Sequence, residues 1–268
     1  MASDEQRLRA LRAEVGRRLV RRFGPRRLAL REEPIGSLIW TVLSQNTTDL
    51  TAERAYRQLR RTFPAWKAVL AAPRPRVEAA IRVSGLAEQK ARTIQEFLAR
   101  LAEFTAETQR TPGTTAAASG GGRSSRRGGS PAAPADNRLS LAFLRRMPAQ
   151  EAMDWLTVSP GIGTKTAAVL LLFAFGKPLF PVDTHIRRVA GRVGFVAEGT
   201  SAEKVQEAFA RLVPASAAGC AQLHLDLIRL GRQLCHPHEP ECPACPLLGV
   251  CRHARRRRVR PASAAVRP

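Results

Sequence analysis

Apolar residues recur along the chain at intervals of three and four, which is the spacing of one face of an α-helix. The first segment shows this most clearly, at Leu8, Leu11, Val15, Leu19 and Phe23. Arginines fill many of the positions between them. The letters GPRR at residues 24–27 then predict the end of an N-terminal amphipathic helix, because glycine and proline both disfavour its continuation.

Helical spacing continues through most of the chain, and no stretch alternates apolar and polar residues as a half-buried strand would. The expected helical stretches include residues 38–43, 52–59, 79–83, 87–101, 139–147, 149–158, 205–212 and 223–234. Residues 166–175, TAAVLLLFAF, are apolar on every side, which is typical of a central, fully buried helix. The sequence therefore predicts an all-α protein.

Two segments do not follow this pattern. Residues 106–138 are mostly Gly, Ser, Thr, Ala and Pro, and such a composition buries too little apolar surface to offset the entropy of ordering. We expect a flexible insertion there. The last seventeen residues, 252–268, hold seven arginines and no acidic residue, and we expect a disordered tail.

The charge balance indicates a polyanionic partner. The chain has 44 basic and 22 acidic residues, a formal net charge of +22, so nucleic acid is the natural partner. Compositional bias of the genome would explain arginine over lysine but not bases over acids. The longest apolar run, residues 167–175, is far shorter than the roughly 20 residues that span a bilayer. We expect a soluble, monomeric protein of the cytoplasm, associated with the nucleoid.

The letters SPGIGTK at residues 159–165 lie between two helical stretches and contain the most informative turn. Gly161 and Gly163 predict backbone angles closed to other residues, so that N–H groups can face a phosphate beside the next helix. Lys165 falls in the first turn of that helix, where the helix dipole disfavours a protonated amine. A lowered pKa would let it attack carbon, whereas the simpler role is a phosphate contact. Among 39 arginines and five lysines, a phosphate contact would more often be arginine, which favours the chemical role.

Asp183, in PVDTH, precedes an apolar periodic segment and is predicted to cap its helix. The same carboxylate could support positive charge on a reacting sugar and move protons.

Four of the five cysteines form the pattern Cys235-x6-Cys242-x2-Cys245-x5-Cys251. Such density indicates a metal site, and by spacing alone either zinc or a [4Fe–4S] cluster would fit, with His236, His238 and His253 nearby. Cys220 lies outside the pattern and is predicted to be an ordinary buried thiol.

SPGIGTKTAAVLLLFAFG, PVDTHIRRV and the cysteine pattern, in this order, resemble the endonuclease III family of DNA glycosylases. The resemblance covers about residues 30–251 and implies a two-lobed helix-hairpin-helix fold with a C-terminal [4Fe–4S] loop. The lobes implied are residues 36–177, with the hairpin at about 155–175, and residues 178–251 joined by an N-terminal helix in residues 1–35. Damaged duplex DNA would lie between them with the base flipped out.

The resemblance also implies residue roles. Lys165 would attack C1′ of the sugar and promote β-elimination, Asp183 would be the essential carboxylate, and the four cysteines of the pattern would hold the [4Fe–4S] cluster. The implied DNA contacts are Gln45, Asn46, Leu86, Gly161, Ile162 and Gly163. The expected activity is removal of oxidised pyrimidines together with AP lyase strand cleavage.

Several positions depart from the family pattern and leave alternatives open. Ser159 stands where a leucine is usual. Either Gln45 or Asn46 would fill the gap left by a flipped base, and Leu86 is either an intercalating wedge or a packing residue. The alternative functions are an AP lyase or mismatch glycosylase with another base preference, and a non-catalytic protein that binds damaged DNA.

Overall fold

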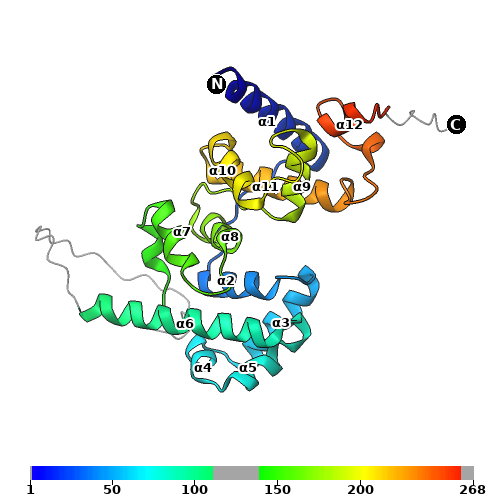
Figure 1. Ribbon diagram of the computed structural model, residues 1–268. Helices are drawn as coiled ribbons and strands as arrows, with labels where there is room; N and C mark the ends of the chain where they lie inside the picture. The colour runs from blue at the N-terminus through cyan, green and yellow to red at the C-terminus, as the bar shows by residue number, and fades with distance from the viewer. Residues whose placement is uncertain (1, 111–138, 261–268) are drawn as a thin grey trace, which may run out of the picture. The chain divides into compact units, whose positions relative to one another are not determined.

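The computed structural model of this protein describes residues 2–110 and 139–260. Within these ranges the regular secondary structure is entirely helical, which confirms the all-α prediction. The α-helices are α1 (Ala2–Phe23), α2 (Pro34–Leu43), α3 (Asp49–Thr62), α4 (Trp66–Ala71), α5 (Arg74–Ile81), α6 (Ala87–Arg110), α7 (Ala149–Thr157), α8 (Thr164–Phe175), α9 (Thr184–Val193), α10 (Ala202–Leu212), α11 (Ala217–Gln233) and α12 (Arg252–Arg256) (Figure 1). The 3₁₀-helices are η1 (Arg82–Ser84), η2 (Ala142–Arg145) and η3 (Cys242–Ala244). Among the described helices, none combines the length and the apolar composition that a membrane crossing requires.

The chain forms two compact units. The terminal unit comprises residues 1–37, 147–157 and 162–268, and the central unit comprises residues 38–146 and 158–161. This division places α8 with the chain ends, whereas the resemblance placed it in the lobe of residues 36–177. The predicted lobe boundaries are not tested further and stay a prediction.

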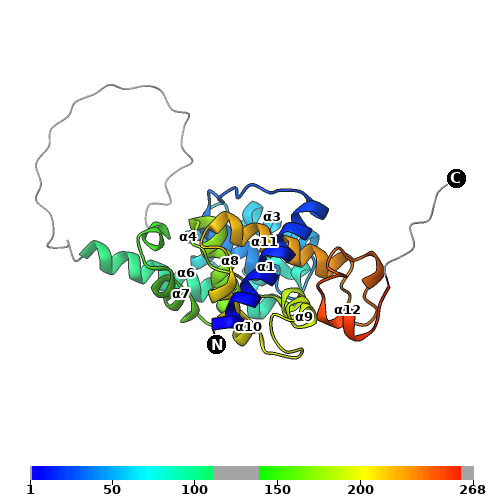
Figure 2. The same ribbon diagram turned by 90° about the horizontal axis from the view of Figure 1, so that it is seen from above.

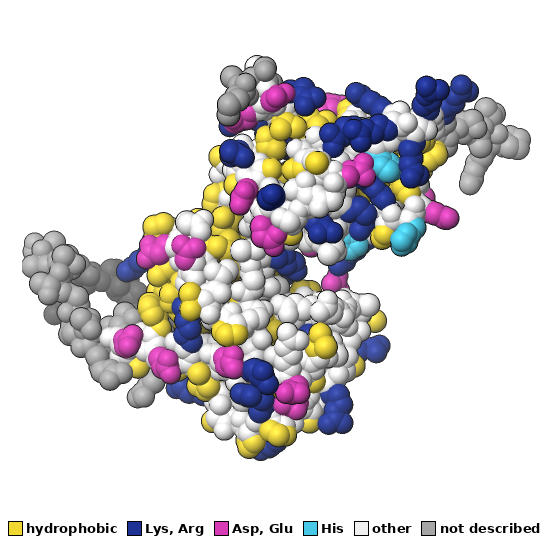
Figure 3. Space-filling model, in the orientation of Figure 1, with side chains coloured by type: hydrophobic (Ala, Val, Ile, Leu, Met, Phe, Trp, Pro, Cys, Tyr) yellow, Lys and Arg dark blue, Asp and Glu magenta, His cyan; other side chains and the backbone are white. Residues whose placement is uncertain are grey.

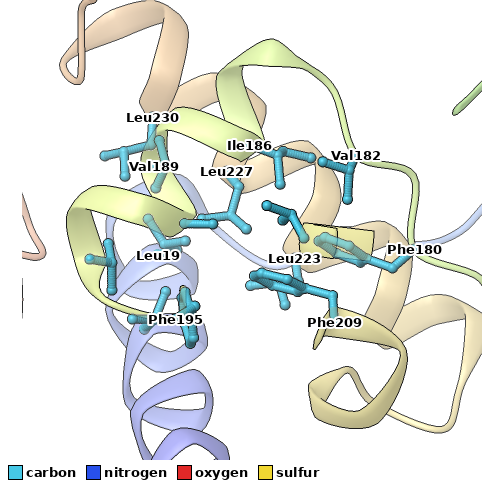
Figure 4. Close-up of a cluster of buried hydrophobic side chains, with 14 of the residues drawn as sticks. Leu19, Phe180, Val182, Ile186, Val189, Phe195, Phe209, Leu223, Leu227 and Leu230 are labelled. Carbon is cyan, nitrogen blue, oxygen red and sulfur yellow. The ribbon is translucent and has the colours of Figure 1, made fainter. Parts of the chain in front are cut away.

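The terminal unit is built around α11, which packs against α1, α8 and α9. Figure 2 shows α1 beside α10 and α11. Three aromatic rings form the middle of its apolar core: Phe180 stacks on Phe209 with centroids 4.8 Å apart, and Phe195 meets Phe209 edge-on at 5.1 Å (Figure 4). Apolar side chains from α1, α9 and α11 converge on these rings, including Leu19, Ile186, Val189, Leu223, Leu227 and Leu230. The predicted apolar face of the N-terminal helix therefore lies in this core.

In the central unit, α4, α5 and η1 pack against α6, and α3 packs against α5 and η1 (Figure 1). The predicted apolar face of α6 is buried, with Ala91, Ile94, Leu98 and Leu101 each at most 1% exposed. Amphipathic spacing thus accounts for how this long helix is held.

Two predicted boundaries are wrong by one helical turn or more. α6 continues to Arg110, so residues 106–110 of the predicted insertion are helical. Residues 252–256 of the predicted disordered tail form α12, whose buried Ala254 anchors it against α9. Residues 111–138 and 261–268 lie outside the described residues.

Candidate functional site

Lys165 lies where the hairpin meets a buried helix. Nine of the twelve residues of α8 are buried, as predicted, and the helix begins at Thr164 with Gly163 as its N-cap. Lys165 is therefore in the first turn, and its side chain is half-buried. The unpaired N–H groups of a helix start favour a bound anion, so the backbone and the amine can act on neighbouring atoms of one phosphorylated ligand.

The two hairpin glycines differ in what they require. Gly161 has a φ of +79°, and a Cβ there would stand 2.2 Å from Thr93 Oγ1, so both the backbone angle and the space demand glycine. Gly163 has a φ of −82° and open space around a Cβ, so the predicted need for glycine is wrong at this position. The side chain of Ile162 is buried, which leaves its main chain for any ligand.

Ser159 is explained by a partner on α6. Its hydroxyl is buried and accepts a hydrogen bond from Arg100 Nη1 at 2.9 Å. Burial lowers the pKa of the Arg100 guanidinium, which shows that this group is partly desolvated. A leucine at residue 159 would remove that acceptor, so the serine matches this arginine.

Asp183 caps α9, as predicted. Its Oδ1 accepts a hydrogen bond from the Ile186 N–H at 2.8 Å, which fixes the carboxylate at the start of the helix. The carboxylate lies in the terminal unit together with Lys165.

His224 on α11 is a buried residue of the same unit that the sequence reasoning missed. Its imidazole is buried, lies close to the rings of Phe173 and Phe180, and donates from Nδ1 to the Pro181 carbonyl at 3.0 Å. Burial lowers its pKa to about 4, Asp183 opposes this shift, and Lys165 adds to it. Lys165 and Asp183 therefore both act electrostatically on one buried neutral ring. The sequence signal that could have identified His224 is its position directly after Leu223, on the apolar face of α11.

The remaining candidate DNA contacts lie in the central unit. Gln45 donates from Nε2 to the Gly161 carbonyl at 3.2 Å, which joins the loop after α2 to the hairpin. Asn46 is exposed with a φ of 55°, and Leu86 is 54% exposed with a φ of 50°. Asparagine adopts such an angle readily, but the angle is strained for leucine, whose side chain has no local hydrogen bond to offset it. Exposed apolar surface and strain at Leu86 are typical of a contact residue.

The four patterned cysteines line one pocket in the terminal unit, together with Arg192 and His253. Arg192 Nη1 donates to Cys235 Sγ at 3.3 Å, and the Leu247 N–H donates to Cys245 Sγ at 3.4 Å. Figure 3 shows basic side chains gathered around α12, which follows this loop. N–H groups directed at sulfur, in a common pocket, are the surroundings that a thiolate-bound cluster requires.

Burial also affects the ionisation of the cysteines. Burial raises the pKa of Cys245 to about 11 and raises those of Cys242 and Cys251, with neighbouring cysteines adding to each shift. Metal ligation would have to displace the thiol protons. In the described part of the chain, no group of three or more Cys, His, Asp or Glu side chains stands arranged to hold a metal ion. Cys220 is a buried thiol with its pKa raised to about 11, as expected of a packing residue.

Comparisons with known proteins find a matching family model and similar proteins that cover most of the chain. Residues 39–215 match the model of the "HhH-GPD superfamily base excision DNA repair protein" family. Endonuclease III of Thermotoga maritima is 30% identical over 244 residues, 91% of this chain and 93% of that protein. Endonuclease III of Sulfolobus acidocaldarius is 30% identical over 219 residues, 81% of each chain. The solved structure of a trapped endonuclease III–DNA covalent intermediate is similar with a TM-score of 0.68 and 26% identity, over 95% of this chain and 99% of that one.

The buried imidazole predicts how stability depends on pH. The folded-state pKa of His224, about 4, lies below its ordinary value of 6.5, so the stabilisation is complete above pH 6.5 and is lost as pH falls toward 4. The shift corresponds to about 3 kcal/mol in the free energy of unfolding. His224→Asn keeps a donor for the Pro181 carbonyl but does not titrate. Denaturant unfolding at several pH values should show the wild type losing stability more steeply than this variant; parallel curves would contradict the assignment.

Proposed function

Because the chain belongs to the HhH-GPD superfamily of base excision DNA repair proteins, we propose that it excises oxidised pyrimidines from duplex DNA and then cleaves the strand as an AP lyase. At the coarser level it is an endonuclease III-like DNA glycosylase. The observation that carries the finer proposal is the position of Lys165 in the open first turn of α8, in the same unit as Asp183, whose carboxylate is fixed by capping α9.

In the proposed reaction, Lys165 Nζ forms a bond to C1′ while the glycosidic bond breaks and its electron pair leaves with the base. Asp183 supports the positive charge that develops on the sugar and accepts a proton from the attacking amine. Opening of the sugar ring gives a Schiff base. Loss of a proton from C2′ then expels the 3′ phosphate, which cleaves the strand by β-elimination.

The partner proposed is duplex DNA that contains a damaged base or an abasic site. The formal net charge of +22 and the glycine turn at the start of α8 support phosphate binding. Two of the similar solved structures are complexes of endonuclease III with DNA. A monomer in the cytoplasm, associated with the nucleoid, fits this partner.

Asn46, rather than Gln45, is the residue we assign to the gap left by the flipped base. The amide of Gln45 already bonds to the Gly161 carbonyl, whereas Asn46 is exposed and has a positive φ. Leu86 would enter the base stack beside it as the wedge. Gly161, Ile162 and Gly163 would hold the backbone phosphates through main-chain groups.

A [4Fe–4S] cluster held by Cys235, Cys242, Cys245 and Cys251 is the cofactor proposed. The shared pocket and the N–H groups directed at Cys235 and Cys245 support it. When bound, the cluster would cross-link this loop, which has little regular secondary structure, through its four cysteines.

Borohydride trapping on abasic duplex DNA tests the lysine assignment. The intact protein should form a covalent adduct because borohydride reduces the Schiff base to a stable amine, and Lys165→Ala should form none. Asp183→Asn keeps a helix-capping side chain and should trap roughly 100-fold more slowly. Lys204→Ala changes an exposed lysine of α10 and serves as the control. An undiminished adduct with Lys165→Ala would refute the assignment.

Duplexes that each carry one lesion test the substrate class. Oxidised pyrimidines should be released with a kcat/KM about tenfold or more above that for oxidised purines or mismatched bases, as hydrogen-bond recognition of a base permits. Preferred release of a mismatched base would support the alternative glycosylase. Specific binding of every lesion without release by the wild type would support the non-catalytic alternative.

The cysteine assignment predicts a brown protein with broad visible absorption that contains both iron and acid-labile sulfide. Cys245→Ser should lose most of this absorption, whereas Cys220→Ser, outside the pattern, should retain it. A colourless protein that contains zinc after purification without air would contradict the assignment.

A further inference from the structure

Lys90, in the first full turn of α6, is a buried cation with two defined acceptors. It is 2% exposed, and its Nζ donates to the carbonyls of Leu43 and Ser84, each at 2.8 Å. Burial lowers the pKa of this ammonium, so its two hydrogen bonds must offset a real desolvation cost. The bond to Leu43 joins residues that are 47 apart in sequence, whereas Ser84 lies six residues before Lys90, in the preceding 3₁₀-helix.

Both acceptor carbonyls belong to the last residue of a helix. Leu43 is the last residue of α2, and Ser84 is the last residue of η1. Terminal carbonyls of a helix lack partners within the helix and carry the negative end of its dipole, so a cation stabilises them. One ammonium therefore joins two helix ends that are far apart in sequence.

The loops that leave these two ends contain the two candidate contacts with a positive φ, which is strained at Leu86. Asn46 follows three residues after Leu43, and Leu86 follows two residues after Ser84, with φ angles of 55° and 50°. Strained angles of this kind persist only where the surrounding structure fixes the backbone on each side. The hydrogen bonds of Lys90 fix the start of both loops at once.

The same face of α6 also carries the hairpin contacts. Thr93, three residues after Lys90, lies against Gly161, and Arg100 donates to Ser159. Residues 90, 93 and 100 are spaced as one helical stripe. Three segments separated in sequence are thus held by polar side chains on one helix face within the central unit.

We propose that Lys90 is a positioning residue for lesion recognition, which sets the distance between the Asn46 and Leu86 loops so that both side chains can enter the DNA at the extruded nucleotide. The inference rests on the proposed function, since it assumes that these side chains meet DNA. It adds a role for a residue that touches neither DNA nor the reacting sugar.

The test uses a stable tetrahydrofuran abasic analogue placed opposite 2-aminopurine in a duplex, so that no chemistry by Lys165 is needed. Insertion of side chains beside 2-aminopurine changes its stacking and therefore its fluorescence on binding. Lys90→Met preserves side-chain length but removes the donors. We expect it to lose most of the fluorescence change and to bind this duplex roughly 10- to 100-fold more weakly. Lys177→Met removes a lysine that donates to the Met147 carbonyl in the terminal unit, and it should behave as the wild type.

A double-mutant cycle separates positioning from general stability. Leu86→Ala should weaken binding about tenfold in the wild type but less than about threefold in the Lys90→Met background, because the wedge is already misplaced. Thermal unfolding of each variant gives its folded fraction, to which binding is normalised. If Lys90→Met does not fold, Lys90→Gln, whose shorter side chain retains a donor, takes its place in the cycle.

Two outcomes would overturn the inference. Additive effects of the Lys90 and Leu86 changes would show that Lys90 only stabilises the fold. A wild type without any fluorescence change would show that the loops do not enter the DNA. Borohydride trapping by Lys165 is read separately, so a failure of the positioning role is distinguished from a failure of the glycosylase and lyase assignment.

Discussion

The burial of α8 is the constraint on which the candidate site depends. A helix with nine of twelve residues buried is held by packing on nearly every side, so its position and rotation leave little freedom. Only its first turn is open, and Lys165 lies there. Since the N–H groups of that turn also lack helical partners, the same few atoms attract an anion and place an amine beside it. Packing in the core therefore determines where chemistry can occur.

α6 organises the central unit by a different principle. Its apolar face is buried. A second stripe, formed by Lys90, Thr93 and Arg100, contacts the ends of α2 and η1 and the hairpin. Burying a polar side chain costs little free energy only where it forms a hydrogen bond. The carbonyls at helix ends can accept such bonds because they have no partner within their own helix. This stripe holds loops that are too short to build a core of their own.

Local patterns predicted the features that depend on local sequence. The apolar face of α1, the burial of α8 and the cap at Asp183 each follow from residues within a few turns of one another. Lys90, His224 and Ser159 could not be assigned in this way, because their partners lie 47, 43 and 59 residues away. The need for glycine at residue 163 is predicted wrongly, because a G-x-G pattern does not show which of its glycines has the positive φ. α6 ends at residue 110 and α12 at residue 256, both inside segments that composition predicts to be irregular. Composition does not show which residues of such a segment pack against the rest of the protein.

Two of the five lysines have a structural role, and this changes how Lys165 is interpreted. Lys90 and Lys177 both donate to main-chain carbonyls, and the compact ammonium suits a site where the acceptors converge on one point. A guanidinium spreads its donors over a planar fork and would need more space and more acceptors. Lys90 and Lys177 thus act as point donors, and the rarity of lysine alone does not indicate chemistry. What distinguishes Lys165 is its place at the open start of a buried helix, in the same electrostatic field as Asp183 and a neutral histidine.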